Sequence, residues 1–430
     1  MLTANPARRR GVLLINPGGP GGAGLAIASQ VAQIFPASVL EEYDLIGFDP
    51  RGVELSTPVT CGLPPELQVT NVPPYARDAA DVARQAGVAR DVAARCGSSA
   101  TADILPFVNT ANTARDMDRI RAALGERRIS YWGVSYGTYL GAVYSTLFPE
   151  RTDRIVLDSA TGTHGLDVNA SRLFGLGMQI RFPDFAAWLA ARNDTYGLGG
   201  TPEQITAKFF ELAARLDQTP VSGVDGSLFR LVTFDRLYFD VRFPELAGIW
   251  QALDAAQPPA ASVLAGQDIE NALAAQLYVA CNDNDWPESV RTYQRNVAVD
   301  RVRFPMLGAA AANIWTCAFW PVEPVEPAVR ISDRGPTNIM IVENTRDPAT
   351  PLPGALEMRA ALGHRARMVT VDQGGHGVYR LTANVCADTA VTAFFADGRL
   401  PARDLFCRRE TGTATLAGQR VPGWLDQIGP

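Results

Sequence analysis

Six short apolar runs, rich in Val, Ile and Leu, recur along the sequence and restrict the folds that this chain can adopt. A continuous apolar run of this length is typical of a strand that is buried on both faces, as in a parallel sheet. Segments with helical spacing lie between the runs, and strands that alternate with helices predict a doubly wound, mostly parallel α/β sheet. The expected strands cover residues 11–16, 43–49, 128–135, 154–160, 338–344 and 366–372.

The alternation stops between residues 161 and 330, where the sequence predicts mostly helices and loops. Thr201 followed by Pro202 predicts a capped helix start in this span. We therefore expect a core made of residues 1–160 and 331–430, with residues 161–330 inserted as a mostly helical cap over the strand ends. A second insertion, residues 53–105, is expected to be rich in loops.

The charge and the hydropathy of the chain exclude two classes of partner. The net charge is −6, whereas nucleic-acid binding draws on a surplus of Lys and Arg, so we expect no nucleic-acid partner. The most apolar long window begins at Met306, is shorter than the roughly 18 residues of a membrane span and contains Asn313. The arginines ahead of residue 11 resemble the start of a signal peptide, but the apolar run that follows is too short, so a strand is expected there.

The chain has six cysteines, and none shows the CxxC spacing of a zinc or redox site. Disulfides would indicate an exported protein, whereas six buried, reduced thiols would fit a cytosolic enzyme. We expect disulfides, and the simplest pairing joins neighbours along the sequence, namely Cys61 with Cys96, Cys281 with Cys317, and Cys386 with Cys407.

A serine between two glycines follows the third apolar run and precedes a helical segment. Gly133, Ser135 and Gly137 form the pattern GxSxG of a nucleophile elbow, a sharp turn that exposes the serine hydroxyl at the end of a strand. The pattern alone is weak evidence, but the strand before it and the helix after it are the context that the mechanism needs. The sequence therefore predicts Ser135 as a nucleophile.

A serine hydroxyl needs a base to accept its proton, and the chain has three histidines. His376 lies in a glycine-rich loop after the last expected strand, where the order Ser, acid, His puts the base. His364 follows a helix and suits a surface role, and His164 at the entry to the insertion could line the site. We expect His376 to be the base.

The base in turn needs a carboxylate that orients the imidazole. Asp347 lies in the loop after the fifth expected strand, between Ser135 and His376 in sequence, and a "PATP" turn follows it. Asp158, one strand earlier, is the rival, while Glu343 and Asp372 lie at strand ends and are expected to serve structure. Loop placement favours Asp347.

A tetrahedral intermediate also needs hydrogen-bond donors for its oxyanion. The glycine-rich stretch "NPGGPGGAG", residues 16–24, follows the first expected strand, so the backbone amide of Gly19 and that of Tyr136 are the expected donors. The alternative is a phosphate-binding loop, but the stretch lacks the lysine and the spacing of such loops. This chemistry requires neither a metal nor an organic cofactor.

Five motifs, taken together, resemble the tripeptidyl aminopeptidases of actinomycetes, which are related to the prolyl iminopeptidases within the α/β-hydrolase superfamily. The resemblance covers nearly the whole chain and implies an α/β-hydrolase fold and a secreted serine exopeptidase that removes short peptides from a free N-terminus. It also supports disulfides, since members of the group are usually exported. The motifs are "NPGGPGGAG", "GVSYGTYLG", "RDPATP", "GGHGVY" and "CADTAVTAFFADGRLPARDLFC".

The sequence departs from this family in two places. Relatives usually have strands and a signal peptide ahead of the first strand, which here begins at Gly11, so a trimmed or processed chain is expected. In addition, "ENTR" precedes Asp347 where relatives usually have a glycine-containing turn.

An exopeptidase needs a carboxylate that pairs with the ammonium group of its substrate. Asp283 and Asp285 are candidates, although either could equally belong to a solvated turn or a helix cap. We expect a peptide or a small acyl compound as substrate. The alternatives are an esterase, amidase or thioesterase that acts on a small natural product, and a catalytically silent binding protein on the same fold.

Overall fold

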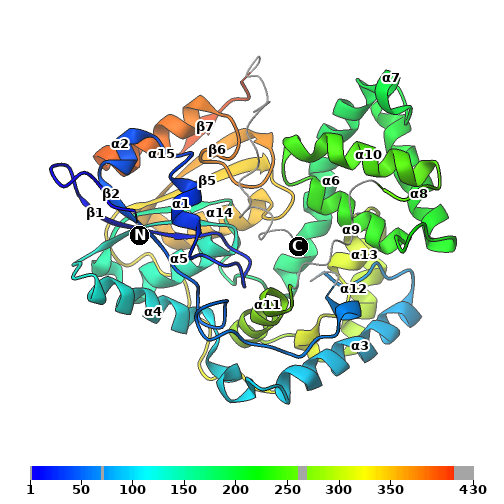
Figure 1. Cartoon of the computed structure of the whole chain (residues 1–430), viewed down its shortest axis with the longest axis horizontal. Coiled ribbons are helices and arrows are strands. Elements are labelled where there is room, and N and C mark those ends of the chain that lie inside the picture. The colour runs from blue at the N-terminus through cyan, green and yellow to red at the C-terminus, as the bar shows by residue number, and fades with distance from the viewer. Residues whose placement is uncertain (1, 69–71, 260–268, 411–430) are drawn as a thin grey trace.

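The computed structural model describes residues 2–68, 72–259 and 269–410 (Figure 1). Its centre is a seven-stranded sheet in the order β2-β1-β3-β4-β5-β6-β7, and every pair of neighbouring strands is parallel. All six predicted strands are present, which confirms the α/β sheet, and a short seventh strand extends one edge. The strands are β1 (Gly11–Asn16), β2 (Tyr43–Gly47), β3 (Ile129–Val134), β4 (Thr152–Asp158), β5 (Ile339–Arg346), β6 (Ala366–Gly374) and β7 (Leu405–Cys407).

Helices cover both faces of the sheet. Side chains alternate along each strand, so that Leu13 and Ile15 of β1 pack into one apolar cluster while Val12 and Leu14 pack into another. The first cluster includes residues of α1 (Ile27–Val31), α2 (Ala37–Leu40) and α15 (Val385–Asp397). The second includes residues of α4 (Thr110–Ala123), α5 (Tyr136–Leu147) and α14 (Leu352–Leu362). The sheet is therefore the middle one of three layers.

A long run of helices separates β4 from β5 in the sequence, and we call the elements from α6 to η5 the helical insertion. As predicted, Thr201 caps one of its helices, because its side chain accepts a hydrogen bond from the backbone N–H of Gln204. Figure 1 shows α6, α8, α9 and α10 grouped beside the sheet. The helices are α6 (Val168–Ala190), α7 (Asn193–Tyr196), α8 (Pro202–Gln218), α9 (Gly226–Arg236), η4 (Asp240–Arg242), α10 (Phe243–Asp254), α11 (Glu270–Asp283), α12 (Val290–Arg303), α13 (Gly308–Ala311) and η5 (Thr316–Phe319).

The division into residues 1–160, 161–330 and 331–430 stays a prediction, and parts of it, residues 260–268 and 411–430, lie outside the described residues. Outside the helical insertion, the described residues contain four short 3₁₀ helices, η1 (Pro65–Leu67), η2 (Ala102–Phe107), η3 (Pro149–Arg151) and η6 (Gly363–Arg365).

The span of residues 53–105, predicted to be a loop-rich insertion, contains the 19-residue helix α3 (Ala79–Gly97), and its place in the domain division stays a prediction. Asp78 caps this helix by accepting hydrogen bonds from the backbone N–H groups of Ala80 and Asp81. Half of its buried residues are alanines, and the others are Val82, Val92 and Cys96. A face made of small residues gives a weak apolar pattern in the sequence, which explains why this helix was not predicted.

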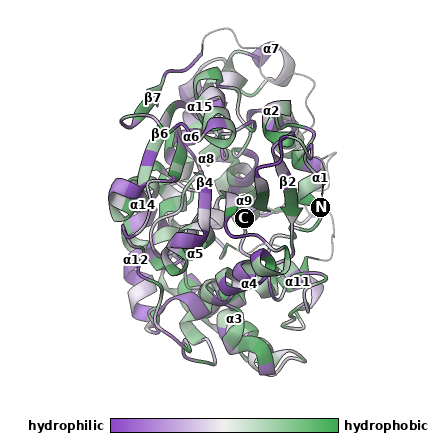
Figure 2. Cartoon of the chain, turned by 90° about the vertical axis from the view of Figure 1, so that its left-hand side faces the viewer, coloured by the Kyte–Doolittle hydropathy of each residue, from purple (hydrophilic) through white to green (hydrophobic). Residues whose placement is uncertain are grey.

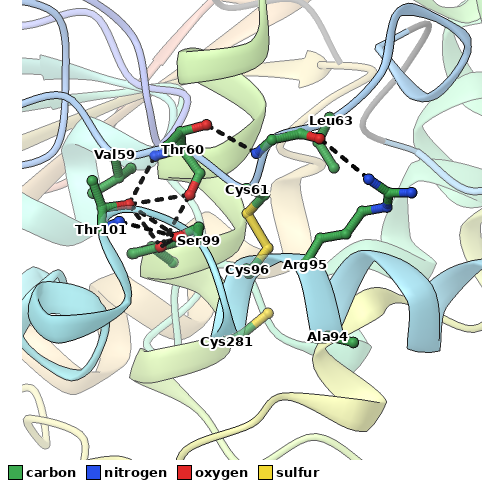
Figure 3. The surroundings of a disulfide bond; sticks show 12 residues. Val59, Thr60, Cys61, Leu63, Ala94, Arg95, Cys96, Ser99, Thr101 and Cys281 are labelled. Carbon is green, nitrogen blue, oxygen red and sulfur yellow. Dashed lines mark hydrogen bonds between the residues drawn. A yellow bond between two sulfur atoms is a disulfide. The ribbon is translucent and has the colours of Figure 1, made fainter.

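Three disulfides confirm the predicted pairing. Cys61–Cys96 joins α3 to the preceding loop, beside a hydrogen-bonded group of Thr60, Ser99 and Thr101 (Figure 3). The other two disulfides, Cys281–Cys317 and Cys386–Cys407, join α11 to η5 and α15 to β7.

The outer helices carry the polar surface of the molecule. Figure 2 shows hydrophilic stretches on α12 and α14 and a hydrophobic strand β2 within the sheet. None of the helices in the described part of the chain is both long enough and apolar enough to cross a membrane.

Candidate active site

Ser135 occupies a strained turn between β3 and α5. Its φ of 58° and ψ of −128° lie in a region that residues with a side chain rarely adopt. The flanking glycines are needed for space, because a Cβ atom at Gly133 would lie 2.4 Å from the carbonyl oxygen of Gly137. A Cβ atom at Gly137 would lie 2.8 Å from Oδ1 of Asn16. The turn therefore has the geometry that the GxSxG pattern predicts.

The glycine-rich loop after β1 lies directly against this turn. Gly18 has a φ of +106°, and a Cβ atom at this position would lie 2.9 Å from the Cβ atom of Ser135. Its backbone N–H donates to Oδ1 of Asn16, the last residue of β1, at 3.0 Å. The next residue, Gly19, lines a cavity of about 60 Å³ together with Ser135 and Tyr136.

His376 and Asp347 form a hydrogen-bonded pair, and both side chains are fully buried. Nδ1 of His376 lies 3.0 Å from Oδ1 and 2.9 Å from Oδ2 of Asp347. Oδ1 of Asp347 also accepts hydrogen bonds of 2.8 Å from the backbone N–H groups of Ala349 and Thr350 in the "PATP" turn. The turn thus fixes the carboxylate, and the carboxylate fixes the imidazole.

The second ring nitrogen of His376 is available as an acceptor. A carboxylate only accepts hydrogen bonds, so the proton belongs on Nδ1 and Nε2 carries the lone pair. Nε2 is buried and has no hydrogen-bond partner among the described residues, so no hydrogen bond joins it to Ser135. Two residues that contact His376 nevertheless line the cavity of Ser135: Thr350, whose Oγ1 is 3.4 Å from Nδ1, and Tyr238, whose ring meets the imidazole edge-on at 5.0 Å.

Asp158, the rival acid, is not the carboxylate to which the imidazole is hydrogen-bonded. Its carboxylate accepts hydrogen bonds from the backbone N–H groups of Val378 and Tyr379, at 2.7 and 2.9 Å, and from Nε1 of Trp132 at 3.1 Å. Burial raises the pKa of Asp158 to about 7. Its role in the structure is to hold the loop that follows His376.

Two further residues at the carboxyl ends of β4 and β5 hold the same loop, and no local sequence pattern identifies them. Oγ of Ser159 accepts a hydrogen bond of 2.7 Å from the backbone N–H of Gly377. The side-chain amide of Asn344 donates to the carbonyl oxygen of Gly375 at 2.9 Å. Because parallel strands end at one edge of a sheet, polar residues in these positions are candidates for supports of the site.

Glu343 and Asp372 have structural roles. Oε2 of Glu343 accepts a hydrogen bond of 2.7 Å from the backbone N–H of Ala160, and burial, followed by the charge of Asp347, raises the pKa of Glu343 well above its ordinary value. Asp372 pairs with Arg346 at 3.0 Å.

Arg346 also donates to Asp184 of α6 at 3.0 Å. The arginine of "ENTR", one of the two departures from the family pattern, therefore connects the loop of Asp347 to the helical insertion.

The two proposed ammonium ligands lie away from the cavity of Ser135. Asp283 accepts hydrogen bonds from the backbone N–H and the hydroxyl of Thr110, at 2.8 and 2.6 Å, and burial raises its pKa to about 6. The hydroxyl of Thr110 is in turn hydrogen-bonded to the hydroxyl of Tyr136. Asp285 is exposed. Neither carboxylate lines the cavity, so their role in ammonium binding stays a prediction without support from this geometry.

The other two histidines, His164 and His364, are exposed and do not line the cavity. No group of three or more His, Cys, Asp and Glu side chains that could hold a metal ion occurs among residues 2–68, 72–259 and 269–410.

Comparison with known proteins gives matches over most of the chain. Residues 304–407 match a family model of α/β hydrolases that is described as "TAP-like protein". The chain is 36% identical, over 422 residues, to the tripeptidyl aminopeptidase of Streptomyces lividans, and the alignment covers 94% of this chain and 78% of that protein. The family match and the parallel sheet confirm the predicted α/β-hydrolase fold.

Two mycobacterial proteins are also similar. The chain is 30% identical over 433 residues to the serine protease Hip1 of Mycobacterium tuberculosis, an alignment that covers 92% of this chain and 81% of that protein. It is 31% identical over 425 residues to carboxylesterase B of the same species, with 93% of this chain and 80% of that protein covered.

Proposed function

We propose that this chain, which belongs to the tripeptidyl aminopeptidase family of α/β-hydrolase serine peptidases, releases tripeptides from the free N-termini of its substrates. Identity of 36% over 94% of the chain to a tripeptidyl aminopeptidase supports this class of substrate. The observation that carries the chemistry is the buried pair of Asp347 and His376, whose Nε2 has no hydrogen-bond partner among the described residues.

Acyl transfer would proceed through three side chains. The hydroxyl of Ser135 attacks the carbonyl carbon of the scissile bond while Nε2 of His376 accepts its proton. The imidazolium passes this proton to the leaving amine, and Asp347 stabilises the charged ring. A water molecule, activated by the same imidazole, then hydrolyses the ester on Ser135 and releases the tripeptide.

The backbone amides of Gly19 and Tyr136 would bind the oxyanion. Tyr136 is the first residue of α5, where the N–H groups at a helix start have no partner within the helix and carry partial positive charge. Gly19 lines the cavity that Ser135 opens into. Both features support donors that are already in place when negative charge develops on the substrate carbonyl.

An extracellular location is part of the proposal. Disulfides form and persist in oxidising compartments. The three disulfides of this chain therefore support export from the cytoplasm.

A panel of chromogenic substrates tests the proposal. We expect the wild-type protein to cleave tripeptide p-nitroanilides with a free N-terminus and to lose this activity on the N-acetylated forms, while Ser135→Ala is inactive on both. The 31% identity to a carboxylesterase favours an esterase as second candidate. Turnover of simple esters without turnover of the anilides would favour that candidate, and failure of an organophosphonate to label Ser135 would indicate a silent protein.

A further inference from the structure

A second, larger cavity adjoins the cavity of Ser135. It has a volume of about 410 Å³, against about 60 Å³ for the smaller one. The smaller space has room for only a few water molecules, whereas typical ligand pockets measure roughly 300–1,000 Å³. Val72, Gln276 and Trp315 line both cavities, so these three residues form the wall that the two spaces share.

The shared wall contains two polar side chains that are almost fully buried. Gln276 of α11 is only 7% exposed and lines both cavities. Nε1 of Trp315 is buried and has no hydrogen-bond partner in the described part of the chain. Buried polar groups are nearly always hydrogen-bonded, so an unpaired indole N–H on a cavity wall indicates a place for an acceptor of a ligand.

This wall is close to the predicted oxyanion donors. The helix α11 packs against the glycine-rich loop, since a Cβ atom at Gly21 would lie 2.4 Å from the carbonyl oxygen of Ala272 and 3.2 Å from the backbone nitrogen of Gln276. Gly21 is two residues from Gly19. A substrate whose carbonyl oxygen faces Gly19 would therefore meet Gln276 with the neighbouring part of its backbone.

The groups on the wall suit a peptide. The side-chain amide of Gln276 offers both an acceptor and two donors, which match the N–H and C=O of one peptide unit, and the indole of Trp315 donates to a carbonyl. The residues that line the larger cavity include Glu66 and Asp225, the N-cap residue of α9, and include no Lys, Arg or His among the described residues. The negative charge of this cavity thus favours a ligand with a positively charged end.

From these observations we infer that Gln276 and Trp315 bind the backbone of the acyl segment of the substrate, and that the larger cavity holds the residues that precede the scissile bond. The free ammonium group then lies in the larger cavity, on the side of Glu66 and Asp225. This inference rests on the proposed peptidase function and adds to it a binding region for an acyl segment several residues long. Gln276 is accordingly a residue that determines specificity for chain length.

The test compares substrates of increasing length in three proteins. The substrates are the p-nitroanilides of one, two and three residues with free N-termini, and p-nitrophenyl acetate, which is too short to reach Gln276. The proteins are the wild type, Gln276→Leu and Gln33→Leu, in which an exposed glutamine outside both cavities is replaced in the same way.

We expect Gln276→Leu to lower kcat/KM for the tripeptide by about tenfold, the effect of losing one to two hydrogen bonds. The same variant should hydrolyse p-nitrophenyl acetate within twofold of the wild-type rate, and Gln33→Leu should match the wild type on every substrate. Gln276→Glu keeps the size of the side chain and its acceptor. Its loss of kcat/KM for the tripeptide should therefore be smaller than the loss in Gln276→Leu.

Two results would overturn this inference while leaving the peptidase function intact. The first is an equal loss on the tripeptide and on the acetate, which would show a structural role for Gln276. The second is full tripeptide activity in Gln276→Leu. If instead the wild type hydrolyses the acetate but none of the peptide anilides, the proposed function fails, and the inference fails with it.

Discussion

Gly18 is in contact with the turn of Ser135: a Cβ atom at Gly18 would lie 2.9 Å from the Cβ atom of Ser135 and 2.6 Å from the carbonyl oxygen of Val134. The glycine-rich loop and the turn of the serine are therefore a single packed unit. Any side chain at Gly18 would push the loop, and with it the amide of Gly19, away from the cavity.

Gly18→Ala should lower kcat by at least about 100-fold, because the loss of one oxyanion donor costs about that much and the φ of +106° disfavours a side chain. Steady-state kinetics on a tripeptide p-nitroanilide measure the effect. Gly87→Ala is the matched control, since a Cβ atom at Gly87 of α3 would meet nothing within 4 Å. Equal activity of both variants would contradict the assignment of this loop to the oxyanion hole.

Asparagine substitutions separate the two candidate acids. Asp347→Asn should lower kcat by roughly 10³–10⁴-fold, because an amide no longer stabilises the charged imidazole. Asp158→Asn should keep kcat within about tenfold, but it should lower the melting temperature, since an amide nitrogen would face a backbone N–H that now donates to the carboxylate. The opposite ranking of the two activities would make Asp158 the catalytic acid.

Asp283 gives a pH dependence of stability with a defined sign. Burial raises its pKa to about 6 from the ordinary value of 3.8, so between these values the folded state binds more protons than the unfolded state. The free energy of unfolding therefore falls as the pH rises through this window and levels off above about pH 7. Asp283→Asn removes this contribution.

Urea unfolding between about pH 4 and pH 7 measures the difference in free energy of unfolding between the wild type and Asp283→Asn. From the lower to the higher pH, the free energy of unfolding of the wild type should fall relative to that of Asp283→Asn by about 3 kcal/mol at most. Parallel pH curves for the two proteins would mean that Asp283 titrates in the folded protein as it does in the unfolded chain.

Removal of the disulfide between Cys386 and Cys407 should affect stability and not catalysis. The two cysteines are 21 residues apart, and closing a loop of this length stabilises a folded chain by about 3 kcal/mol. The disulfide joins α15 to the edge strand β7, and neither element lines the cavity of Ser135. The double variant Cys386→Ala/Cys407→Ala should therefore melt several degrees lower than the wild type and keep its kcat at 25 °C. A lower kcat in a variant that is still folded would contradict this prediction.

The parts of the fold that the sequence could predict are those with a strong local pattern. The six apolar runs become strands because each is buried on both faces, and Ser135 is recognisable from its two glycines. The strand β7 was missed because it has three residues, one of them the exposed Phe406, and its place depends on pairing with β6 and on the disulfide.

The supports of the site were harder to predict because their partners are distant in the sequence. Asp283 is 173 residues from Thr110, and Ser159 is 218 residues from Gly377. The sequence around a carboxylate or a hydroxyl does not indicate a partner that is so distant. The pairing of Asp347 with His376 could be predicted because the order of acid and base along the chain is itself informative.

The carbonyl oxygen of Tyr238, in the helical insertion, accepts the backbone N–H of His376 at 2.8 Å. Protein engineers who exchange the insertions of two relatives, in order to alter selectivity, would thus also exchange a main-chain anchor of the proposed general base. Chimeras whose crossover points keep residues 237–239 with the recipient would retain that anchor, and grafts that replace them would have to rebuild it.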